Sequence, residues 1–279
     1  MRIHHLSCGT DCPVGGAFFD GRSKGPLGHL VCHCLLLETA SSGLVLIDTG
    51  YGLRDVAKPF PRISRPFAAM LNIRLRQEET ALRQVERLGY AARDVRHIVI
   101  THLDFDHAGG LEDFPWATVH LTATELRTFH EQRRGWVMKE RYRPMQVDEV
   151  RNWRTYDPDG EGWFGFHAVR QMEGLPPEIL LIPLRGHTFG HAGVAIDTGG
   201  GWMLHAGDAY FYHEEVRRTD RRCTPGLRFY QNLMEVDREA RLDNQRRLRE
   251  LSCDASAGGR MICAHDIVEF EACTAGRPL

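Results

Sequence analysis

The stretch VRHIVITHLDFDH, residues 95–107, decides how this chain folds. Its opening, VRHIVI, is rich in β-branched residues and predicts a buried strand. Directly after the strand, six consecutive residues include four side chains that can bind a metal ion: His102, Asp104, Asp106 and His107. A sheet fixes the backbone at a strand end while the side chains fan outward. This placement therefore predicts a metal site at the edge of a sheet.

Three later segments repeat the pattern of an apolar strand that runs into a ligand-type side chain. They are 179–184 (ILLIPL) followed by His187, 201–205 (GWMLH) followed by Asp208, and 260–263 (RMIC) followed by His265. If these strand ends gather on one rim of the fold, their side chains converge on the first cluster. A single core histidine is more often hydrogen-bonded than metal-bound, but an ordered series of such residues favours a metal centre.

The other strands and helices predict an α/β fold. LVCHCLLLE at 30–38 and GLVLID at 43–48 flank a turn and predict a hairpin. The apolar spacing of 78–89 predicts a helix. The second half follows a similar order, with a strand at 193–197 and a long helix over 233–251. Two similar strand–helix halves predict two sheets packed together with helices outside.

The composition is that of an ordinary globular protein. With 279 residues, of which 42% are hydrophobic, the chain suits a single domain over 1–279. The net charge of −2 gives no electrostatic reason to expect nucleic acid or an anionic membrane as a partner. No apolar run approaches the roughly 20 residues of a membrane span, and the N-terminus lacks the apolar core of a signal peptide. We therefore expect a cytoplasmic protein with reduced cysteines.

The segment 125–178 differs from the rest of the sequence. It is rich in arginine and aromatic residues, and its periodicity is poor. We interpret it as an insertion that borders the active site. Its aromatic side chains are expected either to line an apolar acyl pocket or to form a small core of their own. The sequence leaves open whether the segment closes over the site or joins two subunits of a homodimer.

The motifs LIDTG, HxDxDH, GHTxGH, AGD and AH occur in an order that resembles the metallo-β-lactamase superfamily. The resemblance covers about residues 3–270. It implies a four-layer αβ/βα sandwich of two mixed sheets, with metal ions at one edge between the sheets. It further implies one ion held by His102, Asp104 and His187, a second held by Asp106, His107 and His265, and Asp208 as the bridge. Asp48, in LIDTG, matches a position that supports the ligand loop through hydrogen bonds.

Asp104 departs from the family pattern, because most hydrolytic members have histidine there. Two divalent ions bring a charge of +4, and Asp104, Asp106 and Asp208 bring −3. A hydroxide would bring the total to zero, whereas a histidine at 104 would leave +1. We therefore expect a weaker Lewis acid than usual. Zinc is the expected metal, but Mn or Fe would also suit the additional carboxylate.

The resemblance is closest to the acyl-homoserine lactonase branch. It implies a dinuclear hydrolase that opens a lactone or cleaves a related ester of a small-molecule substrate with a metal-bound hydroxide. Asp106 would shuttle a proton as well as bind metal. Tyr210 and Tyr212 follow Asp208 by two and four residues, where the lactonases have an oxyanion-stabilising tyrosine at three. Packing under the loop is the equal alternative for both tyrosines.

Two other activities of the same fold stay open, namely phosphodiester hydrolysis and diiron redox chemistry. Phosphodiesterase relatives usually bring extra domains or a basic face, and the net charge of −2 counts against that reading. Flavodiiron proteins have glutamate at the position of Asp104. They also need a flavin-binding domain, for which this chain has no room.

Overall fold

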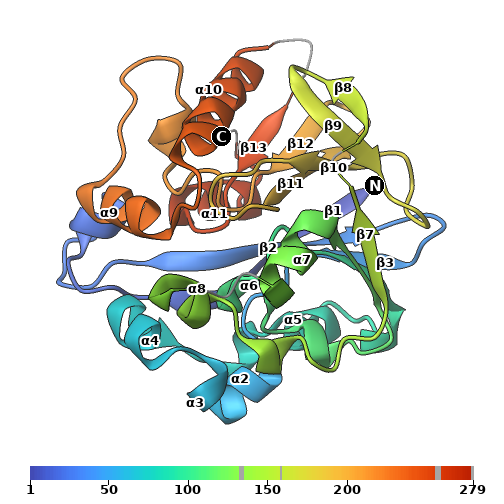
Figure 1. The fold of residues 1–279 in the computed structure, drawn as a ribbon, viewed down its shortest axis with the longest axis horizontal. Coiled ribbons are helices and arrows are strands. Elements are labelled where there is room, and N and C mark those ends of the chain that lie inside the picture. Colours follow the sequence, from blue (N-terminus) through green and yellow to red (C-terminus); the bar gives the residue numbers. More distant parts are fainter. Residues whose placement is uncertain (132–134, 158, 255–258, 278–279) are drawn as a thin grey trace.

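The computed structural model describes residues 1–131, 135–157, 159–254 and 259–277. In this part of the chain, two mixed sheets of seven and six strands pack face to face, with helices on their outer sides (Figure 1). This arrangement confirms the predicted αβ/βα sandwich. None of the described helices combines the length and the apolar character needed to cross a membrane.

The seven-stranded sheet has the order β4-β1-β2-β3-β5-β6-β7. Its strands are β1 (Arg2–Asp11), β2 (Leu30–Glu38), β3 (Leu44–Ile47), β4 (Ile73–Arg74), β5 (Val95–Val99), β6 (Thr118–Thr122) and β7 (Trp153–Tyr156). Strands β2 and β3 form the predicted antiparallel hairpin. Strands β3, β5, β6 and β7 run parallel, so their carboxyl ends meet at one edge.

The six-stranded sheet has the order β13-β12-β11-β10-β9-β8. Its strands are β8 (Glu161–Trp163), β9 (Phe166–Gln171), β10 (Ile179–Pro183), β11 (Ala192–Asp197), β12 (Trp202–His205) and β13 (Arg260–Ile262). The parallel pairing of β12 with β13 brings together the carboxyl ends of two strands that lead into the predicted ligands Asp208 and His265.

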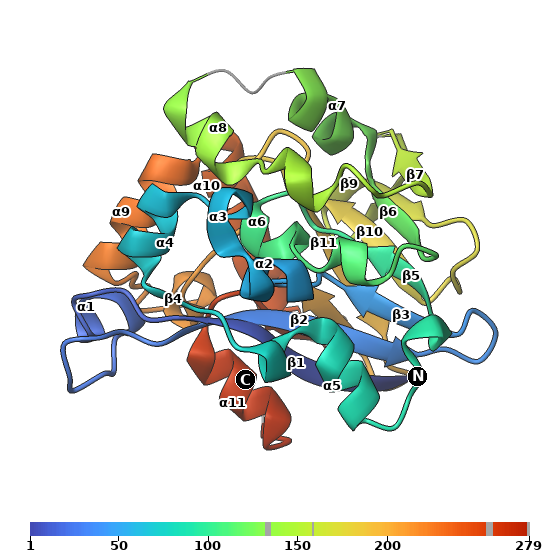
Figure 2. The ribbon, with the colours of Figure 1, turned by 90° about the horizontal axis from the view of Figure 1, so that it is seen from below.

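Helices lie on the outer faces of the two sheets and at the ends of the strands. They are α1 (Ala17–Asp20), α2 (Leu53–Ala57), α3 (Pro59–Arg62), α4 (Arg65–Leu71), α5 (Ala81–Arg87), α6 (Phe105–Ala108), α7 (Ala123–Glu131), α8 (Trp136–Arg141), α9 (Pro225–Met234), α10 (Arg238–Ser252) and α11 (Ile267–Thr274). Short 3₁₀ turns are η1 (Gln77–Glu79), η2 (Ala92–Asp94), η3 (Leu111–Asp113), η4 (Pro144–Gln146) and η5 (His213–Val216). Figures 1 and 2 both show α4, α8 and α9 gathered at one end of the molecule.

Strand β2 is buried on both faces, which explains its nearly continuous apolar sequence. Leu35 and Leu37 point between the sheets and pack with Val194 on β11, while Leu36 joins the core under α5. The residue period of two along a strand produces this division. Side chains of β2 therefore belong to two hydrophobic cores, one on each face of the first sheet.

The long helix predicted over 233–251 is wrong in one respect, because the structure breaks it. Helix α9 ends at Met234, and α10 begins after Asp237, whose side chain accepts a hydrogen bond from the Ala240 amide at 3.0 Å. The Val236 amide donates to the Gly186 carbonyl at 2.8 Å. The break therefore ties this helix pair to the loop that carries His187. At 78–89, the predicted helix is α5 preceded by η1.

The segment 125–178 contributes to both sheets. Strand β7 extends the first sheet beside β6, and β9 pairs with β10 in the second. Tyr142 is buried in the core beneath α5, and Trp163 packs edge-on against Trp202. These aromatic side chains therefore lie in cores that they share with the rest of the chain. Residues 132–134 and 158 of this segment lie outside the described residues.

A histidine pair on β5 and β6 predicts that the stability of the fold depends on pH. On β6, His120 Nε2 lies 2.9 Å from His97 Nδ1, and His120 Nδ1 lies 2.8 Å from the Tyr156 hydroxyl. Burial, together with the neighbouring His97 and Arg154, lowers the pKa of His120 to about 3. Between pH 6.5 and about pH 3, His120 therefore binds a proton in the unfolded chain but stays neutral in the folded chain. The free energy of unfolding should therefore fall as the pH falls.

The free energy of unfolding should fall between pH 6.5 and pH 4.5 in both proteins. We expect this fall to be about 2 kcal/mol smaller in His120→Gln than in the wild type, since one pKa unit corresponds to about 1.4 kcal/mol. Urea unfolding at several pH values measures this difference, with chelator present so that metal release does not contribute. His130→Gln, at an exposed position on α7, is the control. Parallel pH profiles for wild type and His120→Gln would contradict the expectation.

Candidate metal centre

The ends of β5, β10, β12 and β13 bring the predicted ligands into one buried cluster. The loop after β5 and helix α6 carry His102, Asp104, Asp106 and His107, and the other three strands are followed by His187, Asp208 and His265. All seven side chains are nearly inaccessible to solvent. The strand ends therefore do converge on one rim, as the sequence predicts.

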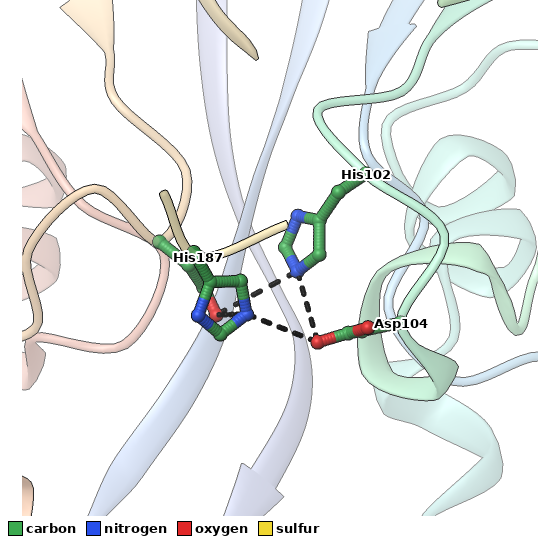
Figure 3. Close-up of side chains that lie close together, drawn as sticks. His102, Asp104 and His187 are labelled. Carbon is green, nitrogen blue, oxygen red and sulfur yellow. Dashed lines mark hydrogen bonds and ion pairs between the residues drawn. The ribbon is translucent and has the colours of Figure 1, made fainter. Parts of the chain in front are cut away.

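The first group of ligand atoms belongs to His102, Asp104, His187 and Asp208, which all lie within 4.8 Å of one another. Figure 3 shows the first three pointing toward a common centre. Asp104 Oδ2 lies 3.3 Å from His102 Nε2 and 3.0 Å from His187 Nε2. Asp208 Oδ2 lies 3.2 Å from His187 Nε2. Two imidazole nitrogens and two carboxylate oxygens suit a tetrahedral divalent ion.

The second group uses the other oxygen of the same aspartate. Asp208 Oδ1 lies 3.3 Å from His107 Nε2 and 3.2 Å from His265 Nε2. Asp106 Oδ2 lies 3.6 Å from His265 Nε2. Cys32 on β2, which reads in the sequence as a core strand residue, also brings its thiol within 4.8 Å of the ligand atoms of Asp106 and His265. One carboxylate oxygen thus faces each group, as a bridging aspartate requires.

The electrostatics of the cluster fit bound cations. His102 Nε2 and Asp208 Oδ1 are buried and have no hydrogen-bond partner within the described residues. Burial and the nearby His107 lower the pKa of His102 to about 4, so its nitrogen presents a lone pair. Burial opposes ionisation of Asp208, but His265 and His107 outweigh it and hold its pKa well below the usual range. The buried His/Asp clusters are consistent with a dinuclear metal site.

Asp48 orients the ligand loop from behind. Its backbone lies in the left-handed region, with φ of 56°. Its carboxylate accepts hydrogen bonds from the Thr101 amide and hydroxyl, each at 2.8 Å, and lies 2.8 Å from His107 Nδ1. A proton on His107 Nδ1 leaves Nε2 free to face the cluster. The supporting role expected of LIDTG agrees with these contacts.

Glu125, which the sequence did not single out, joins the two ligand loops. This buried carboxylate accepts from the Leu103 amide at 3.0 Å and from the Thr188 hydroxyl at 2.6 Å. It also accepts from the Tyr142 hydroxyl and the Gly190 amide. In the sequence, Thr122 and Glu125 have the spacing of an ordinary helix start, so no local pattern distinguishes this glutamate.

Arg141 is the second contact that sequence reasoning missed. It ends α8 and is completely buried. Its Nε donates to Asp104 Oδ1 and its Nη2 to Asp104 Oδ2, each at 2.6 Å. Nη1 donates to the Met234 carbonyl at 2.7 Å. An arginine in a basic, aromatic segment normally indicates a solvated surface, so the sequence held no sign of this pair.

The structure does not bring Tyr210 to the ligand cluster. Its buried hydroxyl donates to Glu269 at 2.9 Å. Tyr212 lies against His213 and Gly21. The phenol that does border the cluster is Tyr230 of α9, which lines a small recess together with the predicted ligands Asp106 and His265. Nothing in the motif order marks Tyr230, because it reaches the site from a helix 22 residues beyond Asp208.

The family assignment follows from comparison with known proteins. The model of the metallo-beta-lactamase superfamily matches residues 27–253, which include all the predicted ligands except His265. The chain belongs to the metallo-β-lactamase superfamily. A probable metallo-hydrolase from Mycobacterium tuberculosis is 40% identical over 274 residues, covering 95% of this chain and 80% of that relative. This superfamily member therefore has a close relative along nearly its whole length.

More distant superfamily relatives include lactonases. An N-acyl homoserine lactonase from Bacillus thuringiensis is 27% identical over 192 residues, which is 67% of this chain and 68% of the lactonase. A solved N-acyl homoserine lactone hydrolase superposes with a TM-score of 0.70 at 22% identity, covering 97% of this chain and 95% of that one. A dizinc quorum-quenching lactonase reaches 0.61 at 16% identity, covering 94% and 86%. At these identities, the two structures bear on the fold alone.

Proposed function

We propose that this protein is a dinuclear metal-dependent hydrolase that opens a lactone or cleaves a related ester. The observation that carries the proposal is the position of Asp208, whose two oxygens face the two groups of ligand atoms separately. The distant relationship to N-acyl homoserine lactonases supports the substrate class. Bound in such a site, two divalent ions polarise a substrate oxygen and supply a hydroxide nucleophile at neutral pH.

The walls of the recess beside the ligands favour a neutral, apolar substrate. Five apolar side chains line it, namely Phe19, Leu30, Leu71, Phe211 and Leu227. Its other lining groups are Asp11, Asp106, Tyr230 and His265, without a lysine or arginine among the described residues. Such apolar walls suit the acyl part of a neutral lactone or ester better than the charged group of a phosphodiester. The recess holds only about 10 Å³, so a substrate has to displace side chains as it enters.

Two side chains of the recess have roles in this proposal. Asp106 lies beside His265 and would pass a proton to the leaving oxygen. Tyr230 would donate its phenolic proton in a hydrogen bond to the oxyanion, because its hydroxyl makes no hydrogen bond within the described part of the chain. Burial raises the pKa of Tyr230 well above its usual value, so the phenol stays protonated and able to donate.

We expect Tyr230→Phe to lower kcat about 100-fold with little change in KM, since the loss of one oxyanion donor has an effect of this order. Steady-state kinetics on the best lactone measures the change. Tyr210→Phe is the matched control: it breaks the Glu269 contact and should leave kcat unchanged. A large loss of kcat in Tyr210→Phe with none in Tyr230→Phe would reverse the assignment.

The proposed activity is tested on lactones of varied ring size and acyl length. Proton release is followed for the protein with its metal content measured, beside a metal-stripped sample and a phosphodiester series. Metal-dependent ring opening supports the proposal, and the preferred acyl length reports on the recess. No lactone or ester turnover by protein that holds two metal ions per chain would refute it. Turnover of phosphodiesters alone would change the assigned substrate class. A coloured protein that contains iron would instead indicate redox chemistry.

A further inference from the structure

Asp104 does not enter the cluster as a free carboxylate. Arg141 binds it through two parallel hydrogen bonds of 2.6 Å, the geometry in which a planar guanidinium matches a carboxylate best. Both residues are buried, at 0% exposure for Arg141 and 2% for Asp104. Buried charges are stable only when they are paired and hydrogen-bonded. The residue that departs from the family pattern therefore comes with a dedicated partner from a segment 37 residues away.

The pair is arranged so that one oxygen stays available to the cluster. Oδ1 is turned toward Arg141 Nε, whereas Oδ2 also lies within 3.3 Å of His102 and His187. Because an ionised carboxylate oxygen has two lone-pair directions, Oδ2 can accept from Nη2 and still face a metal ion. Arg141 Nη2 also donates to His187 Nε2 at 2.7 Å, and this hydrogen bond has to open when His187 binds a metal ion, because Nε2 has a single lone pair.

Arg141 also changes the charge count of the site. Two divalent ions, three aspartates and a hydroxide sum to zero, and the guanidinium raises this sum to +1. A site with histidine at position 104 and no arginine has the same +1. Asp104 and Arg141 together therefore carry no net charge, like the imidazole that most hydrolytic members have. The weaker Lewis acidity expected from Asp104 alone does not follow once its partner is included.

We propose that Arg141 is a positioning residue that makes Asp104 a charge-neutral, oriented metal ligand, so that positions 104 and 141 form one functional unit. Nη1 donates hydrogen bonds to the backbone carbonyls of His187 and Met234. These contacts fix the orientation in which Nε and Nη2 meet Asp104. A lysine could supply the charge but not the two-pronged contact. The inference rests on the metal site of the proposed function and is independent of the lactone substrate.

The test is a double-mutant cycle read out by metal binding rather than by turnover. Zinc affinity and equivalents per chain are measured for wild type, Asp104→His, Arg141→Met and the double variant, by competition with a coloured chelator and by elemental analysis. In the wild-type background, Arg141→Met should weaken zinc binding about 10- to 100-fold, the range for removing a partner that orients a ligand. In the Asp104→His background, where the guanidinium has lost its carboxylate, the same change should strengthen binding at least about 10-fold.

Reversal of the sign of the Arg141→Met effect is the expected result. An effect of the same sign in both backgrounds would overturn the inference, because the two residues would then act independently. Lys139→Met removes an exposed cation from the same helix and should change affinity less than about twofold. If Arg141→Met does not fold, Asp104→His and the double variant are compared: stronger binding by the double variant supports the inference, and weaker or equal binding refutes it. Wild type that binds fewer than two ions would instead refute the dinuclear site.

Discussion

Replacing Asp208 with asparagine should remove both metal ions at once. Its two oxygens lie 3.2 Å from His187 and 3.2 Å from His265, one in each group of ligand atoms. An amide has no negative charge, and only one of its two terminal atoms can coordinate a cation. We therefore expect affinity for both ions to fall by more than about 100-fold, above the range seen for partners that only support a ligand. Lactone turnover should fall with it.

Elemental analysis of the folded variant measures this loss, and thermal unfolding in chelator separates it from misfolding. Asp197→Asn is the control, because it makes the same chemical change at a partly exposed position at the end of β11. Two ions per chain in Asp208→Asn would show that the aspartate does not bridge. One ion per chain would show that it serves only one of the two groups.

Asp48→Asn should be nearly as damaging, although Asp48 does not contact the first group of ligand atoms. The carboxylate receives hydrogen bonds from Thr101 and lies 2.8 Å from His107 Nδ1. In the variant, one oxygen becomes an NH₂ that faces these donors. His107 would then have to accept at Nδ1 and carry its proton on Nε2, which would point the proton into the cluster. We expect the second ion to bind about 10- to 100-fold more weakly.

The same substitution leaves buried donors unpaired, so it should also lower the free energy of unfolding by about 1–3 kcal/mol. Asparagine tolerates the left-handed backbone at position 48 as well as aspartate does, and backbone strain is therefore not the cause. Asp220→Asn is the matched control, because Asp220 is exposed and has φ of 52°. Unchanged zinc affinity in Asp48→Asn would show that the tautomer of His107 is fixed in another way.

The position of Arg141 shows that the segment 125–178 contributes a side chain to the buried cluster of candidate ligands. Read as an insertion, the segment is expected to border the active site as a lid or an interface. In the fold, β7 belongs to the first sheet and β9 to the second, and α8 places a guanidinium against Asp104, a predicted ligand. We therefore expect the residue at position 104 and the residue at position 141 to vary together among relatives, because they form one buried ion pair. A relative with histidine at the position of Asp104 is expected to lack the arginine.

The sequence by itself determined several of the strands and the candidate ligands that follow them. Strand β5 followed by HLDFDH needs only local information: β-branched residues form a strand, and the side chains that follow have to project from its end. The same holds for the hairpin of β2 and β3, and for the strands that lead to His187 and Asp208. The order of these units along the chain, through its resemblance to a known superfamily, then predicted that the candidate ligands form one centre.

Only the tertiary structure decided which other side chains reach that centre. Arg141, Glu125 and Tyr230 arrive from α8, α7 and α9, and each looks like a common surface or helix residue in its own segment. A local pattern encodes the conformation of a segment but not its long-range contacts. The helix break before α10 also depends on a long-range contact. The Gly186 carbonyl, which accepts a hydrogen bond from the Val236 amide, lies 50 residues earlier in the chain.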